Sequence, residues 1–410
     1  MPGKILIHSL IFSPDGVSTA YLYNDIALRF QKKGYEVVVL TTTPHYNVVE
    51  SQLVTQPLRW KVWGIYKESC FHGIRVLHIP QKKFRNTFLR LLGFAYWHIV
   101  SFLIGLFQKN VDVILSPSPP LTIGVINIWL AKIKGCKTIY NVQEIYPDIL
   151  KQKKGVIIEL LHKMERYVYN NSTAVVTIDQ VFYDVIVGRF KNKSMLHIIP
   201  NFVDTELYNP QNVDMGALDS NIFPITNSLK LLYAGNIGFA QDWEPLICLA
   251  KRTKGKPIEY FIIGEGVMKP YLEEKVREFQ LDNVYILPYQ PRKLMPTIIA
   301  YSDIQFIFMN PEMEMQGFPS KVYTIMSCGK PLLVCSGMRT PIVNFLQEHN
   351  CAKLVTEKNL EKKVEEMANW LNSVSKEEMN MLGRNGMDVI MHLYAKNVVT
   401  QKYVDLVESL

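Results

Sequence analysis

The chain has 410 residues, of which 48% are hydrophobic and 20% charged, and 45 Lys and Arg against 37 Asp and Glu leave a net charge of +8. This composition excludes a disordered chain, a collagen, a coiled coil and a small disulfide scaffold, and the length suits two globular domains. The six cysteines are scattered without a CxxC pair, so neither a disulfide framework nor a zinc site is indicated. We expect buried free thiols in a reducing compartment and no signal peptide.

The first half of the chain alternates short apolar strands with helical patterns. A strand over residues 4–10 is followed by a turn and by a helix that ends at Gly34, and the continuous apolar run 35–41 is typical of a strand buried on both faces of a parallel sheet. Further strands are expected over residues 111–115, 138–142, 174–178 and 197–199. This alternation predicts a doubly wound α/β domain over residues 1–200.

The second half repeats the same alternation after a polar, turn-rich segment, residues 209–228, which we interpret as a linker or exposed connection. Strands are expected over residues 229–233, 259–263, 284–287, 304–308 and 331–334. The sequence therefore predicts a second Rossmann-like domain over residues 201–390 that faces the first across a cleft. A C-terminal helix over residues 391–410 is expected to pack back on the first domain.

Residues 87–107 form the most hydrophobic stretch, which falls just short of the ~18 to 20 apolar residues of a spanning helix. A span would also separate the strand at 111–115 from its sheet partners, so a buried or interfacial helix is favoured. Upstream, Trp60, Trp63 and Tyr66 together with the basic segment 82–85 have the composition of a membrane-surface patch. A solvated basic face beside a core helix is the alternative.

In a parallel sheet, ligands bind beyond the carboxyl ends of the strands, and several polar residues of the first domain lie there. Gly16 follows the first strand and opens a helix, where it permits backbone N–H groups to approach an anion or serves as a plain structural glycine. His45 follows the next strand and is a candidate acceptor contact or an ordinary loop histidine. Gln143 and Glu144 follow the strand at 138–142, with Tyr146 behind them, and a carboxylate there can take a proton from an attacking hydroxyl.

The second domain carries a glycine turn at the equivalent place, directly after its first strand. Gly235, Asn236 and Gly238 form a GxxG pattern with Gln241 in the next turn, and Gly264 begins a second tight turn after the following strand. The pattern differs from GxGxxG, and no acidic residue caps a following strand, so a hydride-transfer enzyme is disfavoured. The approach of a phosphate to this turn is favoured instead, whereas the turn at Gly264 is equally consistent with a purely structural role.

The segment 316–331 is the most informative one. Ser320 supplies an N-cap for a helix that runs to Cys328, and Gly329 ends that helix before a strand. Lys321 then lies in the first helical turn, where a cation opposes the helix dipole and a bound anion would reverse the penalty. The pattern predicts a diphosphate-binding lysine, with a solvated lysine as the alternative.

Six short motifs follow one another in a fixed order, over residues 118–122, 141–147, 200–208, 235–241, 264–266 and 319–331. In this order they resemble the GT-B glycosyltransferases of family 4, in the branch that builds bacterial surface polysaccharides. The resemblance implies two Rossmann-like domains, with a nucleotide-sugar donor held mainly by the second and an acceptor by the first. It also implies a retaining transfer that requires neither a metal nor another cofactor.

Transferred position by position, the resemblance assigns roles to individual residues. Lys321 and the turn from Gly235 to Gly238 would hold the donor diphosphate, Gly16 would close on it from the other domain, and Ser320 would cap the helix that points at it. The nucleobase loop corresponds to the segment around Tyr289. Glu144 matches the acidic member of the family's catalytic pair, and its role toward sugar or acceptor is implied by this match alone.

The chain departs from the family pattern at three positions. The family carries two glutamates eight residues apart, for the donor sugar and the ribose, and these positions are Gln316 and Thr324 here. Gln316 can bond sugar hydroxyls but cannot stabilise a developing positive charge, and Thr324 can hold one ribose hydroxyl. Glu312 and Glu314 are candidate substitutes. The basic residue expected after the glycine turn is also missing, with Gln241 nearby.

The leading hypothesis is a cytoplasmic transferase, peripheral on the inner face of the membrane, that moves a sugar from a UDP-linked donor to a polyprenyl-diphosphate-linked glycan. A glycosyltransferase-like scaffold that binds nucleotide sugars without turnover is an alternative, motivated by Gln316 and Thr324. A UDP-sugar epimerase on the same fold is a third, although Glu144 is the only well-placed carboxylate. Nucleic acid is disfavoured as a partner because the basic residues form no dense stripe with aromatics.

Overall fold

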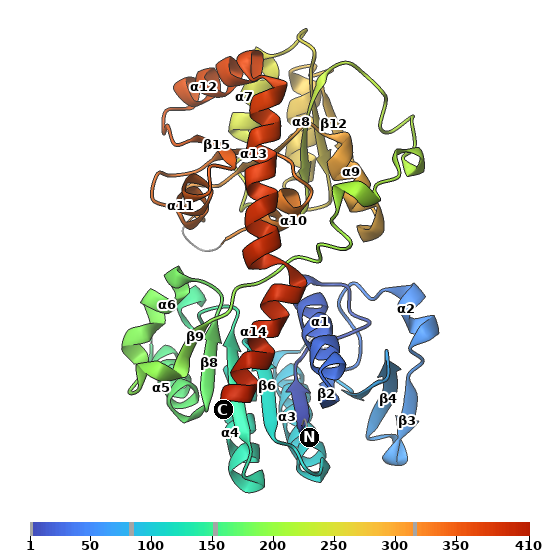
Figure 1. Ribbon diagram of the computed structural model, residues 1–410, viewed down its shortest axis with the longest axis vertical. Coiled ribbons are helices and arrows are strands. Elements are labelled where there is room, and N and C mark those ends of the chain that lie inside the picture. Colours follow the sequence, from blue (N-terminus) through green and yellow to red (C-terminus); the bar gives the residue numbers. More distant parts are fainter. Residues whose placement is uncertain (1–2, 82–85, 151–154, 315–317) are drawn as a thin grey trace. The chain divides into compact units, whose positions relative to one another are not determined.

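The computed structural model describes residues 3–81, 86–150, 155–314 and 318–410 (Figure 1). The chain divides into two compact units. Unit 1 comprises Met1–Asn201 together with Asn397–Leu410, and unit 2 comprises Phe202–Lys396. Each unit is an α/β domain built on a largely parallel sheet.

The sheet of unit 1 has the order β3-β4-β5-β2-β1-β6-β7-β8-β9. Its central strands are parallel and their residues are buried on both faces, as the continuous apolar runs of β1 and β2 predict. The strands are β1 (Lys4–His8), β2 (Glu36–Thr42), β3 (Arg59–Lys61), β4 (Tyr66–Phe71), β5 (Ile74–Ile79), β6 (Val113–Pro117), β7 (Lys137–Val142), β8 (Ala174–Thr177) and β9 (Leu196–Ile198).

Helices cover both faces of this sheet, with α1 and α14 in front of it in Figure 1. On the other face α3 packs beside α4, and α4 beside α5. The helices are α1 (Ser18–Lys32), α2 (Glu50–Thr55), α3 (Thr87–Phe107), α4 (Leu121–Lys134), α5 (Val156–Asn171), α6 (Gln180–Ile186) and α14 (Lys396–Ser409).

The final helix α14 belongs to unit 1 from Asn397 onward. It buries Val399, Tyr403 and Val404, and the Tyr403 hydroxyl accepts a hydrogen bond from Asn141 Nδ2 at 2.7 Å. The segment that rejoins unit 1 therefore begins at 397 and not at the expected 391. The intervening π-helical turn Ile390–Tyr394 packs against unit 2, where Ile390 lies in the core around α10.

Unit 2 contains a parallel sheet of order β12-β11-β10-β13-β14-β15. Its strands are β10 (Leu229–Ala234), β11 (Ile258–Ile263), β12 (Val284–Leu287), β13 (Ile304–Phe308), β14 (Leu332–Cys335) and β15 (Ala352–Val355). Its helices are α7 (Glu244–Arg252), α8 (Lys269–Glu278), α9 (Met295–Tyr301), α10 (Lys321–Ser327), α11 (Pro341–Glu348), α12 (Leu360–Ser373) and α13 (Lys376–Val389). All neighbouring strands pair in parallel, so their carboxyl ends lie at one edge, as a doubly wound domain requires.

Three features differ from the sequence expectation. No strand is expected between residues 42 and 111, yet β3, β4 and β5 extend the first sheet, with β3–β4 and β4–β5 pairing antiparallel. The expected linker 209–228 packs on unit 2: Phe223 is buried beside α9 and Tyr301 donates a hydrogen bond to Pro224 O at 2.7 Å. All six cysteines are free, but Cys70 is exposed.

The apolar helix α3 is capped by Asn86, whose Oδ1 accepts hydrogen bonds from the N–H groups of Phe88 and Leu89. One face of the helix packs into the core through Trp97, Val100 and Ile104. The opposite face leaves large apolar side chains exposed, among them Phe88, Leu92, Ile99, Leu103 and Phe107. Within the described part of the chain this is the one helix long and apolar enough to cross a membrane, and a third of its apolar window is buried inside the protein.

Candidate functional site

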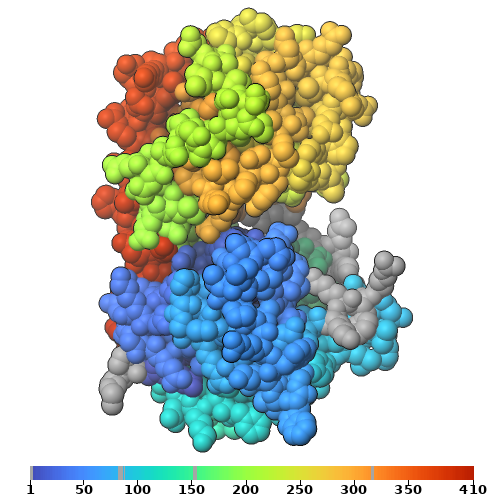
Figure 2. Space-filling view, turned by 90° about the vertical axis from the view of Figure 1, so that its right-hand side faces the viewer, coloured from blue at the N-terminus to red at the C-terminus, as the bar shows by residue number. Residues whose placement is uncertain are grey.

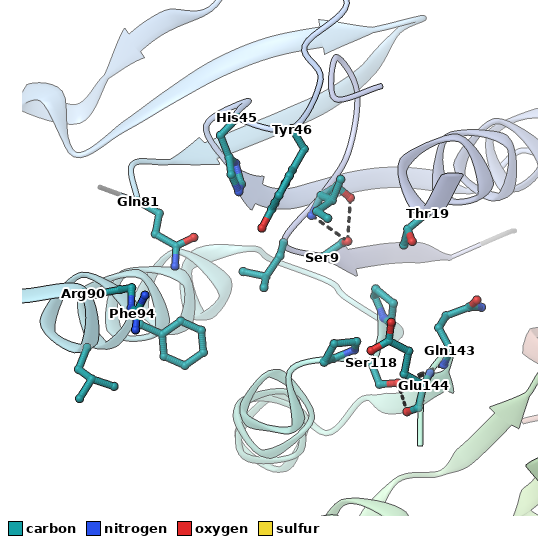
Figure 3. A pocket seen from close by; sticks show the side chains of 15 residues that line it. Ser9, Thr19, His45, Tyr46, Gln81, Arg90, Phe94, Ser118, Gln143 and Glu144 are labelled. Carbon is teal, nitrogen blue, oxygen red and sulfur yellow. Dashed lines mark hydrogen bonds between the residues drawn. The ribbon is translucent and has the colours of Figure 1, made fainter. Parts of the chain in front are cut away.

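Unit 1 contains a cavity of about 790 Å³ at the carboxyl ends of its parallel strands (Figure 3). The residues after β1, β2, β5, β6 and β7 converge there with the start of α1 and the first turns of α3, because the carboxyl ends of parallel strands meet at one edge. The lining residues are Ser9, Leu10, Ile11, Thr19, His45, Tyr46, Gln81, Arg90, Leu91, Phe94, Pro117, Ser118, Pro119, Gln143 and Glu144.

The turn that carries Glu144 is held by the hydroxyl of Ser118. Ser118 Oγ donates to Glu144 O at 3.1 Å and accepts from the N–H of Gln143 at 3.1 Å. The Gln143 side chain bonds Asn141 Oδ1 at 3.2 Å and accepts from Asn201 Nδ2 at 3.0 Å. Within the described residues the Glu144 carboxylate makes no hydrogen bond or ion pair, and it is exposed to the cavity. It is therefore free to accept a proton from a hydroxyl bound there.

His45 lines the same cavity as part of the loop after β2. The carboxylate of the buried Asp15 accepts hydrogen bonds from the backbone N–H groups of His45 and Tyr46, both at 2.7 Å. The His45 ring contacts the Tyr46 ring, and its Nδ1 lies 3.0 Å from Thr42 Oγ1. The imidazole is thus fixed at the wall of the cavity, as an acceptor contact requires.

Two residues expected in this site have other positions. The Gly16 N–H donates to Tyr46 O and Asn47 O, so it is not available to an anion. A Cβ at Gly16 would lie 2.4 Å from Asn47 O, and this close approach of the chain explains the glycine. Tyr146 packs against the core cluster behind β7 and does not line the cavity, because the chain turns inward after Glu144.

Sequence reasoning missed the contribution of α3. Arg90 and Phe94 of α3 line the cavity together with Gln81, on the side opposite Glu144, and Figure 3 shows the Phe94 ring turned toward the interior. Asn86 sets the start of α3 and thereby places Arg90 one turn into the helix. The isolated charge of Arg90 at the start of an otherwise apolar run was the available signal.

Unit 2 carries a half-buried lysine at the carboxyl edge of its sheet. Lys321 begins α10, and its Nζ lies 3.6 Å from the centre of the Tyr233 ring. A Cβ at Gly235 would lie 2.6 Å from this nitrogen, so the ammonium group points at the glycine turn. Burial lowers the pKa of Lys321 to about 7, and no described residue offers it a carboxylate or a hydrogen bond. A buried amine without a counter-ion is prepared for an anionic ligand.

The glycine turn beside Lys321 leaves backbone donors free. The N–H groups of Asn236 and Gly238 donate no hydrogen bond within the described part of the chain. The turn packs tightly on the next one: a Cβ at Gly264 would lie 1.9 Å from Gly235 O, and Gly264 has a φ of 150°. Gly264 is therefore required for packing, and the free N–H groups with Lys321 form the cradle that a phosphate needs.

Gln241 lies close behind this turn, pairing with Met309 through an isolated bridge. Its side chain is buried, and Oε1 has no partner among the described residues. Tyr289 follows β12 and is 70% exposed, which suits the expected nucleobase loop. These two residues therefore keep their candidate roles.

The start of α10 differs from expectation at Ser320. Ser320 has helical φ and ψ of −57° and −23° and makes no side-chain cap hydrogen bond, because its backbone already belongs to the first turn. The Thr324 hydroxyl donates to Lys321 O at 2.8 Å and retains only its acceptor capacity for a ribose hydroxyl. Glu314, a candidate substitute for the family glutamates, accepts a hydrogen bond from Gly337 N at 2.7 Å instead. Gln316 lies outside the described residues.

Within the described ranges, no group of three or more His, Cys, Asp and Glu side chains is arranged to hold a metal ion. At the two places described here, Glu144 and Arg90 in the cavity of unit 1 and Lys321 in unit 2 are charged groups without an ion pair to the described residues.

Two family models match most of the chain. Residues 20–207 match the model described as Glycosyltransferase Family 4, and residues 219–389 match the model of the Glycosyl transferases group 1. One similar protein is WcaI of Escherichia coli K12, which is named as a colanic acid biosynthesis glycosyl transferase. It is 24% identical over 344 residues, which cover 80% of this chain and 81% of WcaI.

Solved structures resemble the whole chain. The crystal structure of Anabaena HepE in complex with UDP aligns with a TM-score of 0.73 at 14% identity, covering 99% of this chain and 100% of that one. WaaG, a glycosyltransferase involved in lipopolysaccharide biosynthesis, aligns with a TM-score of 0.64 at 13% identity, covering 98% and 99%. These likenesses establish the two-domain GT-B fold.

Proposed function

The chain belongs to glycosyltransferase family 4, and from that premise we propose that it transfers a sugar from a UDP-linked donor to an isoprenoid-diphosphate-linked glycan during synthesis of a bacterial surface polysaccharide. The transfer retains the anomeric configuration and uses no metal, as the family resemblance implies. The observation that carries this proposal is Lys321, whose amine lies against the Gly235 turn and has no counter-ion among the described residues.

Lys321 supplies the charge that a donor diphosphate requires. A diphosphate at the turn would accept hydrogen bonds from Asn236 N–H and Gly238 N–H and form an ion pair with Lys321. The lysine would then neutralise the leaving diphosphate as its bond to the anomeric carbon breaks. The choice of UDP is supported by the relative HepE, whose crystal structures contain UDP and UDP-glucose.

The acceptor side of the reaction is assigned to the cavity of unit 1. A sugar hydroxyl bound between His45 and Glu144 would lose its proton to the Glu144 carboxylate as its oxygen bonds to the anomeric carbon. Gln143, fixed by Asn141 and Asn201, lines the same wall.

We further propose that unit 1 lies on the inner face of the cytoplasmic membrane. The hairpin of β3 and β4 exposes Trp60, Val62 and Trp63, and Lys67 Nζ lies 4.8 Å from the centre of the Trp60 ring. Figure 2 looks onto this part of the molecule, where the blue residues that contain β3 and β4 face the viewer. Exposed tryptophan beside lysine suits an interface with anionic lipid. The basic segment 82–85 of the expected patch lies outside the described residues.

Titration calorimetry with UDP, GDP and CMP tests the donor assignment. We expect UDP alone to bind, and Lys321→Ala to weaken it by roughly 1.5 to 3 kcal/mol, the loss expected for a charge-assisted contact. Binding of UDP-sugars without transfer to any lipid extract would instead favour a non-catalytic scaffold, which the replacements at Gln316 and Thr324 motivate.

Sedimentation with phosphatidylglycerol vesicles tests the membrane assignment. Trp63→Ser should reduce the bound fraction, whereas Ile225→Ser, which changes an equally exposed apolar residue of unit 2, should not. Equal binding of both variants and the wild type would overturn it.

A further inference from the structure

The cavity of unit 1 has one fixed charge of each sign among its lining residues. Arg90 carries the positive charge and Glu144 the negative one, and Figure 3 shows them on opposite sides of the cavity. Neither makes an ion pair with the described part of the chain, so the two charges do not neutralise each other. A ligand that fills the cavity thus meets a carboxylate at one end and a guanidinium at the other.

Arg90 is exposed, so water solvates its charge, and no carboxylate of the described residues pairs with it. Its backbone N–H donates to Asn86 O at 3.0 Å, which places it in the first turn of α3. A cation near a helix N-terminus opposes the helix dipole, so the helix itself does not stabilise the guanidinium there. An anion beside Arg90 would remove this penalty and accept two parallel hydrogen bonds from the guanidinium.

The side chains next to Arg90 are apolar. Leu91 and Phe94 line the cavity with it, and Leu91 is 61% exposed. Phe88, one turn earlier, is 67% exposed. The end of the cavity opposite Glu144 therefore combines one cation with apolar surface, and it suits a ligand whose anionic group is joined to a hydrocarbon.

We propose that Arg90 binds the diphosphate of the isoprenoid-linked acceptor, while Leu91 and Phe94 contact its first isoprene unit and the glycan extends toward Glu144. This inference rests on the proposed function and names the residue that recognises the lipid carrier. It assigns Arg90 to acceptor binding and leaves the donor diphosphate to Lys321 in the other unit.

Binding of geranyl diphosphate, geraniol and inorganic diphosphate to the full chain tests the inference, with UDP present in excess to fill the donor site. The wild type should bind geranyl diphosphate more tightly than either of the other two. Arg90→Gln should weaken geranyl diphosphate about tenfold or more, the loss of a charged hydrogen bond, and leave geraniol unchanged. Phe94→Ala should weaken geraniol and geranyl diphosphate and leave inorganic diphosphate unchanged.

Three comparisons keep the result decisive. Arg166→Gln, which removes an exposed arginine of α5 outside the cavity, should bind as the wild type does, and Arg90→Lys should recover part of the affinity. Equal binding by Arg90→Gln and wild type overturns the inference, and so does inorganic diphosphate binding as tightly as geranyl diphosphate, which would indicate a site for a free anion. Absence of UDP binding with Arg90-dependent binding of geranyl diphosphate would reject the donor assignment alone.

Discussion

The ammonium group of Lys321 lies 3.6 Å from the centre of the Tyr233 ring. A cation over an aromatic face recovers part of the free energy lost on burial, about 2 kcal/mol when the pair is desolvated. The Tyr233 hydroxyl also donates to Asn236 O at 2.7 Å and so holds the turn that faces the lysine. One tyrosine thereby positions both components of the proposed diphosphate site.

Lys321→Met is expected to stabilise the ligand-free protein. The pKa of Lys321 is about 7 in the folded state and about 10.5 in the unfolded chain, so the unfolded state holds more protons between these values. Below pH 10.5 this difference in bound protons destabilises the folded state. Replacing the charge by an apolar side chain should therefore raise the free energy of unfolding, by an amount of order 1 to 4 kcal/mol. Urea unfolding at pH 7 measures the gain, and Lys254→Met at an exposed position of unit 2 should show none.

The affinity for a UDP-sugar should fall as the pH rises above 7. Lys321 must be protonated to pair with the diphosphate, and its pKa in the free protein is about 7. Above that value binding takes up a proton, so the affinity decreases about tenfold per pH unit until the raised pKa of the complex is reached. Calorimetry between pH 6 and 9 measures this slope. A flat profile would show that Lys321 does not contact the diphosphate.

Glu144→Gln should abolish turnover while leaving the donor site intact. The amide keeps the shape of the carboxylate but cannot accept the hydroxyl proton, and loss of such a group costs about 10²- to 10⁴-fold in rate. Release of UDP in the presence of acceptor lipid measures kcat, and UDP titration reports the donor site. A variant with the wild-type rate would remove Glu144 from the mechanism.

Stability should decrease as the pH falls from 6.5 toward 4. Burial lowers the pKa of both His8 and His78 to about 4, so each folds as a neutral ring while the unfolded chain takes up protons below 6.5. At pH 5 this amounts to about 2 kcal/mol for each histidine. Urea unfolding at pH 7 and pH 5 gives the difference. His98 and His197, whose pKa values burial also lowers, add to this difference. His78→Gln should reduce it by about 2 kcal/mol, and His392→Gln at an exposed site should not.

Much of the fold followed from local patterns because a strand buried on both faces leaves a continuous apolar run in the sequence. The expected strands at 35–41 and 138–142 lie within two residues of β2 and β7. β4 and β5 were missed because Tyr66–Phe71 mixes apolar with charged residues, as an antiparallel strand with one exposed face does. β5 joins the sheet by pairing in parallel with β2, and β4 pairs antiparallel with β5.

The candidate site residues also divide into those that a local sequence pattern predicts and those that depend on the tertiary fold. Glu144 and Lys321 directly follow a predicted strand or a predicted break, so sequence position alone placed them at an edge. For Gly16 the sequence left an anion-binding and a structural role open, because a glycine required by the approach of Asn47 O has the same letter as one that admits a phosphate. Arg90 was missed because its isolated charge before an apolar run marks the residue but not the cavity that it lines, which depends on how α3 lies over the sheet.

The return of α14 to unit 1 gives the last residues of the chain a role far from their place in the sequence. Tyr403 holds Asn141, and Asn141 holds Gln143 at the wall of the cavity. A premature stop codon that removed only this helix would remove the hydrogen bond of Tyr403 to Asn141 and thereby destabilise the proposed acceptor site. For the same reason a single cut at Asn201 does not release an intact first domain, and an excised version needs residues 397–410 joined to it by a linker.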